Sequence, residues 1–193
     1  MKKIEKKDLW SLEEYAIERA NFRRQILAHK RVRRLTLGRH ATLFFEDFQT
    51  IKYQIQEMLR IEKIFEPQAI DEEIEAYNPL IPDGTNWKAT LMFEYPDPSE
   101  RNQALRNMAG IEHQVWTRVN CFGKNFGKAN DDLDRTNDTK TAAVHFLRFE
   151  FNTREIDAMK EGENIELGIE HDSLQYKVQL SDPERTSLLQ DFD

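Results

Sequence analysis

The chain has 193 residues, of which 39% are hydrophobic and 33% charged, with a formal net charge of −7 at pH 7. This composition is typical of a globular protein of one domain, with or without an appendage, and excludes a disordered chain. No apolar run approaches the roughly 20 residues of a membrane span, and the charged start lacks the apolar core of a signal peptide. We therefore expect a cytoplasmic protein with no membrane partner. The single cysteine, Cys121, excludes an intramolecular disulfide and any multi-cysteine metal site within one chain.

The N-terminal third is predicted to be mainly helical. Ser11 and Glu14 form the capping box of a first helix that ends near residue 30. A strand is expected over residues 40–46, followed by a second, amphipathic helix from about Thr50 to Phe65. A third helix begins at residue 67, a proline, and ends before the proline at 79.

The rest of the chain alternates strands with short helices. Strands are predicted over residues 87–95, 111–121 and 142–151, a hairpin over 164–180, and helices over 98–110, over 153–162 and from 182 onward. The polar, glycine-bearing segment 122–141 is predicted to be a mobile loop. We expect an α+β fold, an antiparallel sheet with the N-terminal helices packed on one face. Residues 1–151 would form a single α+β domain, and residues 152–193 a helix–hairpin–helix extension packed on that domain.

Positive charge is concentrated between Arg19 and Phe45, a window without carboxylates that holds eight of the 28 basic residues. Residues 29–39 are the densest part. They suit either a phosphate- or RNA-binding module or a solvated helix end whose cations complement the helix dipole. We favour the helix end and do not expect a nucleic-acid partner, because the remainder of the chain is acidic and aromatic residues are not interleaved.

Several polar residues fall where the patterns predict the core. Strict alternation over residues 142–151 places His145 on the inner face of its strand and Arg148 on the other face, and alternation from residue 111 onward does the same for His113. The apolar stripe of the first helix contains Arg19 and Arg23. That of the second contains Gln54 and Glu62. Since a buried unpaired charge is costly, we expect these groups to have partners.

Three interpretations of these residues remain open. The first is structural, an Arg–Glu network with two hydrogen-bonded core histidines. The second is a metal site for iron or zinc, in which His113, His145 and Glu62 are ligands together with Glu57. No HExxH motif or short-spaced ligand pair supports it.

The third interpretation is an anion pocket in a small enzyme acting on an anionic metabolite. Its ligand-binding residues would be Arg19, Arg23, Gln54 and Arg148. A histidine, His145 or His113, would act as general acid–base and hence as the catalytic residue. No glycine-rich phosphate loop or nucleophile motif accompanies these residues.

Four strings of the sequence carry a family resemblance: YQIQEMLR (53–60), AYNPLIPDG (76–84), GIEHQVW (110–116) and KTAAVHFLRFEF (140–151). From Leu12 to Phe151 the chain resembles an uncharacterised bacterial family catalogued as domain of unknown function 3501, and the segment after Phe151 lies outside the resemblance. The resemblance implies no known reaction. It implies a gene neighbourhood with rubrerythrin and a heterodisulfide-reductase-like iron–sulfur protein. An accessory role in an iron-linked redox or oxidative-stress system, with those proteins as partners, is therefore our first expectation.

Overall fold

The computed structural model describes residues 2–120, 122–129 and 141–193; Cys121 and most of the loop predicted to be mobile lie outside these ranges. The described helices are α1 (Leu12–Arg31), α2 (Phe48–Glu62), α3 (Pro67–Tyr77), α4 (Pro98–Asn107), α5 (Thr153–Glu161) and α6 (Asp182–Leu189). The described strands are β1 (Arg34–Thr36), β2 (Ala41–Glu46), β3 (Asn86–Phe93), β4 (Val115–Val119), β5 (Asn125–Phe126), β6 (Lys128–Ala129), β7 (Val144–Glu150), β8 (Ile165–His171) and β9 (Leu174–Gln179). Within these ranges, no helix has the length and apolar character needed to cross a membrane.

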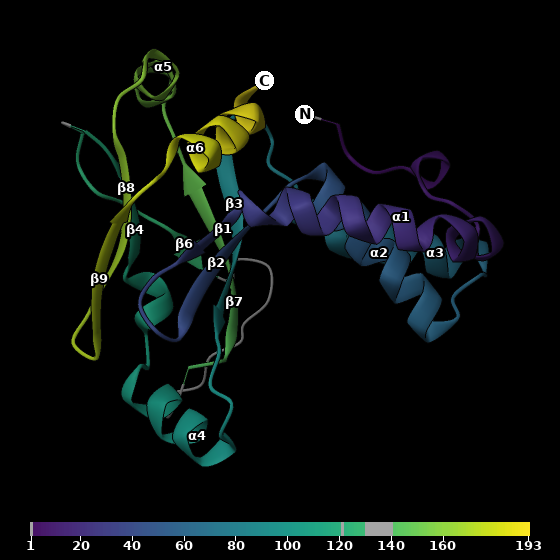
Figure 1. Cartoon of the computed structure of the whole chain (residues 1–193), viewed down its shortest axis with the longest axis horizontal. Helices are drawn as coiled ribbons and strands as arrows, with labels where there is room; N and C mark the ends of the chain where they lie inside the picture. Colours follow the sequence, from purple (N-terminus) through teal and green to yellow (C-terminus); the bar gives the residue numbers. More distant parts are fainter. Residues whose placement is uncertain (1, 121, 130–140) are drawn as a thin grey trace.

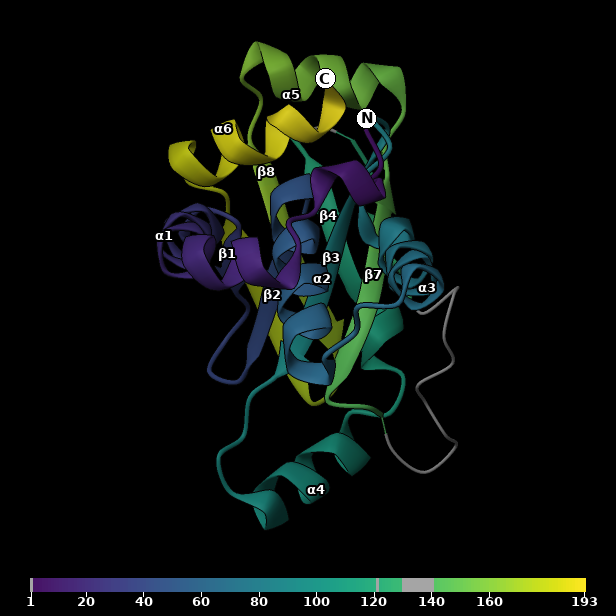
Figure 2. The same cartoon turned by 90° about the vertical axis from the view of Figure 1, so that its right-hand side faces the viewer.

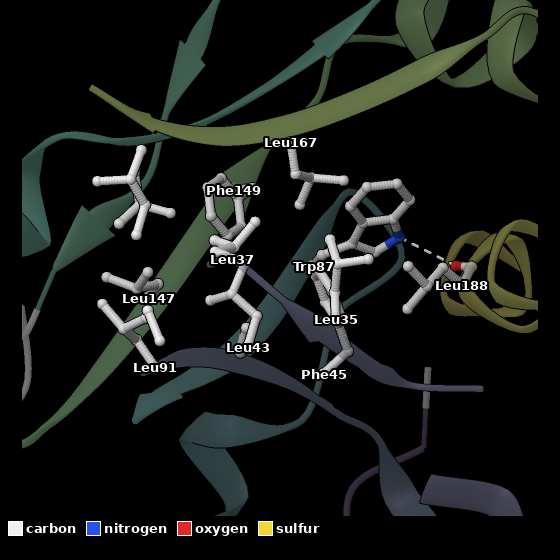
Figure 3. Close-up of a cluster of buried hydrophobic side chains, with 14 of the residues drawn as sticks. Leu35, Leu37, Leu43, Phe45, Trp87, Leu91, Leu147, Phe149, Leu167 and Leu188 are labelled. Carbon is white, nitrogen blue, oxygen red and sulfur yellow. Dashed lines mark hydrogen bonds between the residues drawn. The ribbon is translucent and has the colours of Figure 1, made fainter. Parts of the chain in front are cut away.

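The strands form two antiparallel sheets that face each other. One sheet has the order β1-β2-β3-β7-β6 and the other β5-β4-β8-β9. The main core fills the space between them, with Trp87, Leu147 and Phe149 from the first sheet meeting Leu167 from the second (Figure 3). Helices α1, α2 and α3 lie on the opposite side of the first sheet (Figure 1). The α+β class and the packing of the helices on one sheet face are thus confirmed. The structure has two antiparallel sheets where the sequence predicted one.

Alternation along β3 and β7 gives the five-stranded sheet two different faces. Trp87 and Leu91 on β3 are buried in the core, as are Leu147 and Phe149 on β7. The intervening side chains are only partly buried and point to the helical side. This pattern follows from the two-residue period of a strand. The inner face therefore makes the core, and the outer face is left for other contacts.

Helix α2 ends three residues earlier than the sequence pattern indicates. It is capped at its start by Asp47, whose side chain accepts a hydrogen bond from the Thr50 backbone, and it stops where Lys63 adopts a left-handed conformation with φ of 55°. Phe65, the predicted last residue of this helix, therefore lies beyond its end and is exposed, and Ile61 within α2 is exposed as well. The capping box of α1, Ser11 with Glu14, forms as predicted.

The C-terminal residues contribute to the same core as the rest of the chain. Strand β8 pairs with β4, bringing Ile169 opposite Val115. Helix α6 covers one end of the sandwich, where the indole Nε1 of Trp87 donates to the Leu188 carbonyl at 3.0 Å (Figure 3). Phe192 packs on Trp87 with the ring centroids 5.5 Å apart.

A segment of five residues passes from one sheet to the other. Asn125 and Phe126 pair with β4, whereas Lys128 and Ala129 pair with β7. Between them, the Gly127 amide donates to the Val115 carbonyl. A Cβ at Gly127 would lie 2.9 Å from the Phe149 ring, so this crossing requires a residue without a side chain.

The guanidinium of Arg33 is buried and has several charged and polar partners. Its side chain is only 1% exposed and lies 2.6 Å from Asp191 Oδ2 and 3.4 Å from Asp47 Oδ2. It also donates to the carbonyls of Phe45, Glu46 and Ser187. The network therefore joins the strand before α2 to the C-terminal residues.

The pKa values of two carboxylates around Arg33 are shifted in opposite directions. Burial raises the pKa of Asp191 to about 6, although Arg33 opposes the rise. Burial also acts to raise the pKa of Asp47, but the hydrogen bond with His29 and the charge of Arg33 outweigh it, so that pKa is lowered. Arg33 thus offsets the desolvation cost of burying these two carboxylates.

Replacing Arg33 by Met should destabilise the fold by about 3–5 kcal/mol, because Asp191 would stay buried without its cation. The loss relative to the unmodified protein should grow as the pH rises above about 6, where the folded unmodified protein ionises Asp191 and the folded variant still holds its proton. Urea unfolding at several pH values measures both effects. The exposed neighbour Arg34→Met is the control, and an equal loss in both variants would contradict the assignment.

Candidate functional site

His145 lies in the interior and hydrogen-bonds to neighbours that the sequence did not indicate. Its Nε2 is 2.7 Å from Thr141 Oγ1 and 2.9 Å from the Ala142 carbonyl. The Thr141 hydroxyl in turn donates to Glu112 Oε2 at 2.8 Å. A buried threonine therefore bridges the imidazole to a buried carboxylate, which lies 3.9 Å from Nε2. The inward-facing polar partner from the segment before β4 is Glu112.

The expectation that His113 points into the core is wrong. Its side chain is 62% exposed. Residues Ile111–His113 form a 3-10 helix after Gly110, whose φ is 83°, and the strand begins only at Val115. A 3-10 helix has three residues per turn, so the two-residue alternation does not apply there and Glu112 turns inward instead.

The four residues predicted as metal ligands are dispersed. Glu62 is exposed at the end of α2. Glu57 faces α1, where Arg19 contacts both of its oxygens, at 2.7 and 3.0 Å, and the Tyr15 hydroxyl donates to it at 2.7 Å. Within the described ranges, no group of three or more His, Cys, Asp or Glu side chains is placed to hold a metal ion. The His/His/Glu pocket is therefore not assembled there.

The predicted anion-binding residues separate into two places. Arg19 is paired with Glu57, and Arg23 is exposed; both border a shallow depression on α1. Gln54 and Arg148 instead line one groove on the outer face of the five-stranded sheet.

This sheet groove has a volume of about 910 Å³ and lies between the sheet and helices α2 and α3. Figure 2 shows α2 in front of β2, β3 and β7. The apolar lining includes Phe44, Met58, Tyr77, Leu80, Met92 and Phe146. The polar lining includes Lys30, Glu46, Gln54, Glu73, Lys88, Lys128 and Arg148. The groove therefore combines an apolar wall with charged groups.

Charged residues of the groove form one row across four strands. The register places Glu46 opposite Lys88, Lys88 opposite Arg148, and Arg148 opposite Lys128. Three cations therefore follow one another from β3 to the sheet edge. Arg148 Nε also lies 2.9 Å from Glu150 Oε1, and the Lys88 amine donates to the Pro79 carbonyl, so both side chains are held near the groove.

The acidic end of the row is buried and fixed by two hydroxyl groups. Glu46 Oε2 accepts a hydrogen bond from Thr50 Oγ1 at 2.6 Å, and Oε1 accepts one from Thr90 Oγ1 at 2.7 Å. The next level of the sheet is largely apolar, with Phe44 and Phe146 on either side of Thr90. The cationic side chains and the aromatic side chains therefore lie at adjacent levels of the groove, where an anion with an apolar part could contact both.

The sequence contains the same signal for Lys88 as for Arg148, which the alternation of its strand had already placed on the outer face. Lys88 and Arg148 occupy alternate positions on strands whose other faces are apolar, so both were assignable to an outer face. A similar signal exists for Arg33, which precedes the buried Leu35 and Leu37 at intervals of two. No local pattern indicates that Arg33 meets Asp191.

Residues 3–192 match a family described as a protein of unknown function, DUF3501. The chain belongs to this family. The match includes the C-terminal segment that the resemblance had left outside, in keeping with the pairing of β8 to β4. A crystal structure described as a novel protein of unknown function from Burkholderia pseudomallei is 39% identical, covers all of both chains and has a TM-score of 0.94. No curated protein matches the chain.

Glu57→Gln should lower the free energy of unfolding by about 1–2 kcal/mol at pH 7, because a partly exposed carboxylate loses its bond to a charged guanidinium. The hydrogen bond from Arg19 lowers the pKa of Glu57 to about 2, against burial. Its stabilising effect is therefore complete above about pH 4.5 and is lost as the pH falls toward 2. Denaturant unfolding of both proteins over this range tests the effect. The control is Glu62→Gln, and a difference independent of pH would contradict it.

Proposed function

We propose that this protein binds a small organic anion with an apolar part in the sheet groove. The observation that carries the proposal is the row of Lys88, Arg148 and Lys128 beside the aromatic level of the same groove. The volume of about 910 Å³ falls within the range of small-molecule sites.

The lining residues indicate which part of the ligand each of them would contact. The planar guanidinium of Arg148 suits a carboxylate, sulfonate or phosphate, which Lys88 and Lys128 would further neutralise. Phe44, Phe146 and other apolar side chains would cover the uncharged part. Because Glu46 repels anions, the charged end should lie toward Lys128, at the other end of the row.

Binding is better supported than catalysis. The described residues that line the groove include no histidine. His145 belongs to the inner face of β7 and His113 to the exposed 3-10 helix. The histidines predicted as the general acid–base of a small enzyme therefore lie outside the groove.

The cytoplasmic location and the accessory role beside rubrerythrin or an iron–sulfur protein stay predictions. The accessory role rests on the family resemblance, and a bound organic anion neither requires nor opposes it.

The fluorescent anion 1-anilinonaphthalene-8-sulfonate is a suitable probe, because it joins a sulfonate to aromatic rings. We expect saturable one-to-one binding that Arg148→Gln weakens by about tenfold through the loss of a charge-assisted contact. Lys128→Gln should weaken it less. Octanoate should compete with the probe, whereas octylamine should not.

The matched controls are Arg118→Gln and Lys124→Gln, whose side chains pair with Glu166 and Glu170 of the other sheet. These variants should bind the probe like the unmodified protein. Equal weakening in the controls, or no change in Arg148→Gln, would contradict the proposed site. Near-ultraviolet circular dichroism checks that each variant keeps its packed core, since this probe also binds partly unfolded proteins.

A further inference from the structure

Helix α1 carries an exposed stripe with heptad spacing. Its residues follow one another at intervals of four, three, four, three and four, and all are exposed: Glu13, Ile17, Ala20, Arg24, Leu27 and Arg31. This spacing is typical of a helix face that packs along a second helix. Ile17 is 79% and Leu27 49% exposed, although both are large aliphatic residues. We call this stripe the α1 seam. Figure 2 shows α1 on the side of the helical layer away from α3.

The α1 seam is complementary to itself when reversed. A second α1 running antiparallel, with a two-fold axis midway between Ala20 and Arg24, would place Glu13 opposite Arg31. The same alignment places Ile17 opposite Leu27 and the small Ala20 opposite the long Arg24. Each contact occurs twice, as a two-fold interface requires.

The surface of α1 also provides a recess for the partner's side chain. A shallow depression is bordered by residues that include Arg24, Leu27, Ala28 and Arg31. In the antiparallel alignment, Ile17 of the second copy would enter this depression. Insertion of one side chain among several of the facing helix is how paired helices pack.

We propose that two copies of this chain associate through the α1 seam as an antiparallel, two-fold symmetric dimer. The alternative occupant, a nucleic acid bound by the arginines, fits less well, because the seam begins with Glu13 and contains two aliphatic residues. The contact involves little more than two helices of 20 residues each, so the dimer should be weak and dependent on concentration.

Sedimentation velocity from about 5 to about 500 µM should show a monomer–dimer equilibrium, as small interfaces do. Glu13→Arg and Arg31→Glu should each weaken dimerisation by about tenfold or more, because each turns two attractive contacts into repulsive ones. The double variant Glu13→Arg/Arg31→Glu should restore it, since the opposite charges meet again. Ile17→Asp should abolish it.

The matched controls are Glu161→Arg and Arg154→Glu, which make the same charge changes at exposed positions of α5 and should leave dimerisation unchanged. Thermal melting confirms that each variant is folded. A monomer at every concentration, or a dimer that the double variant fails to restore, would overturn the proposal. Binding of a short RNA that Arg31→Glu weakens and Glu13→Arg strengthens, without any dimer, would instead assign the seam to phosphate groups.

Discussion

The buried guanidinium of Arg33 connects the segment after α1, the end of β2 and the C-terminal residues. It follows α1 directly, contacts the carbonyls at the end of β2 and the residue that caps α2, and pairs with Asp191 near the last described helix. Since breaking up the partners of an ion this deeply buried is costly, these contacts favour the observed positions of all these segments. The placement of α2 over the sheet, and hence one wall of the groove, depends on this arrangement.

The groove exists because the five-stranded sheet has helices on one side and a second sheet on the other. Its inner face is apolar and fills the core, as the alternation on β3 and β7 requires. The outer face then carries cations and aromatic rings at successive levels, and helices α2 and α3 stand over it without filling it. A groove of this kind needs no special sequence motif. It is lined by the outward-facing side chains of strands whose inward-facing side chains form the core.

Local patterns in the sequence predict much of this fold, because caps and periodicity are short-range properties. Ser11 with Glu14 and the proline at 67 locate two helix starts, and alternation assigns both faces of β7. The patterns fail where a few residues change geometry. The 3-10 turn before β4 exposes His113 and buries Glu112, and Lys63 ends α2 before Phe65. Pairings between distant residues, such as Arg33 with Asp191 or Lys88 with Arg148, depend on topology that no single segment encodes.

The crossing at Gly127 limits how the two sheets can move. Residues 125–129 belong to one sheet at their start and to the other at their end, so along this margin the sheets are joined by a continuous backbone. Separation of the sheets would have to pivot here and widen toward the opposite margin, where β1 and β9 lie. Lys128, at the pivot, would then move least, and the groove's outermost cation would keep its position while the remainder of the sandwich fluctuates.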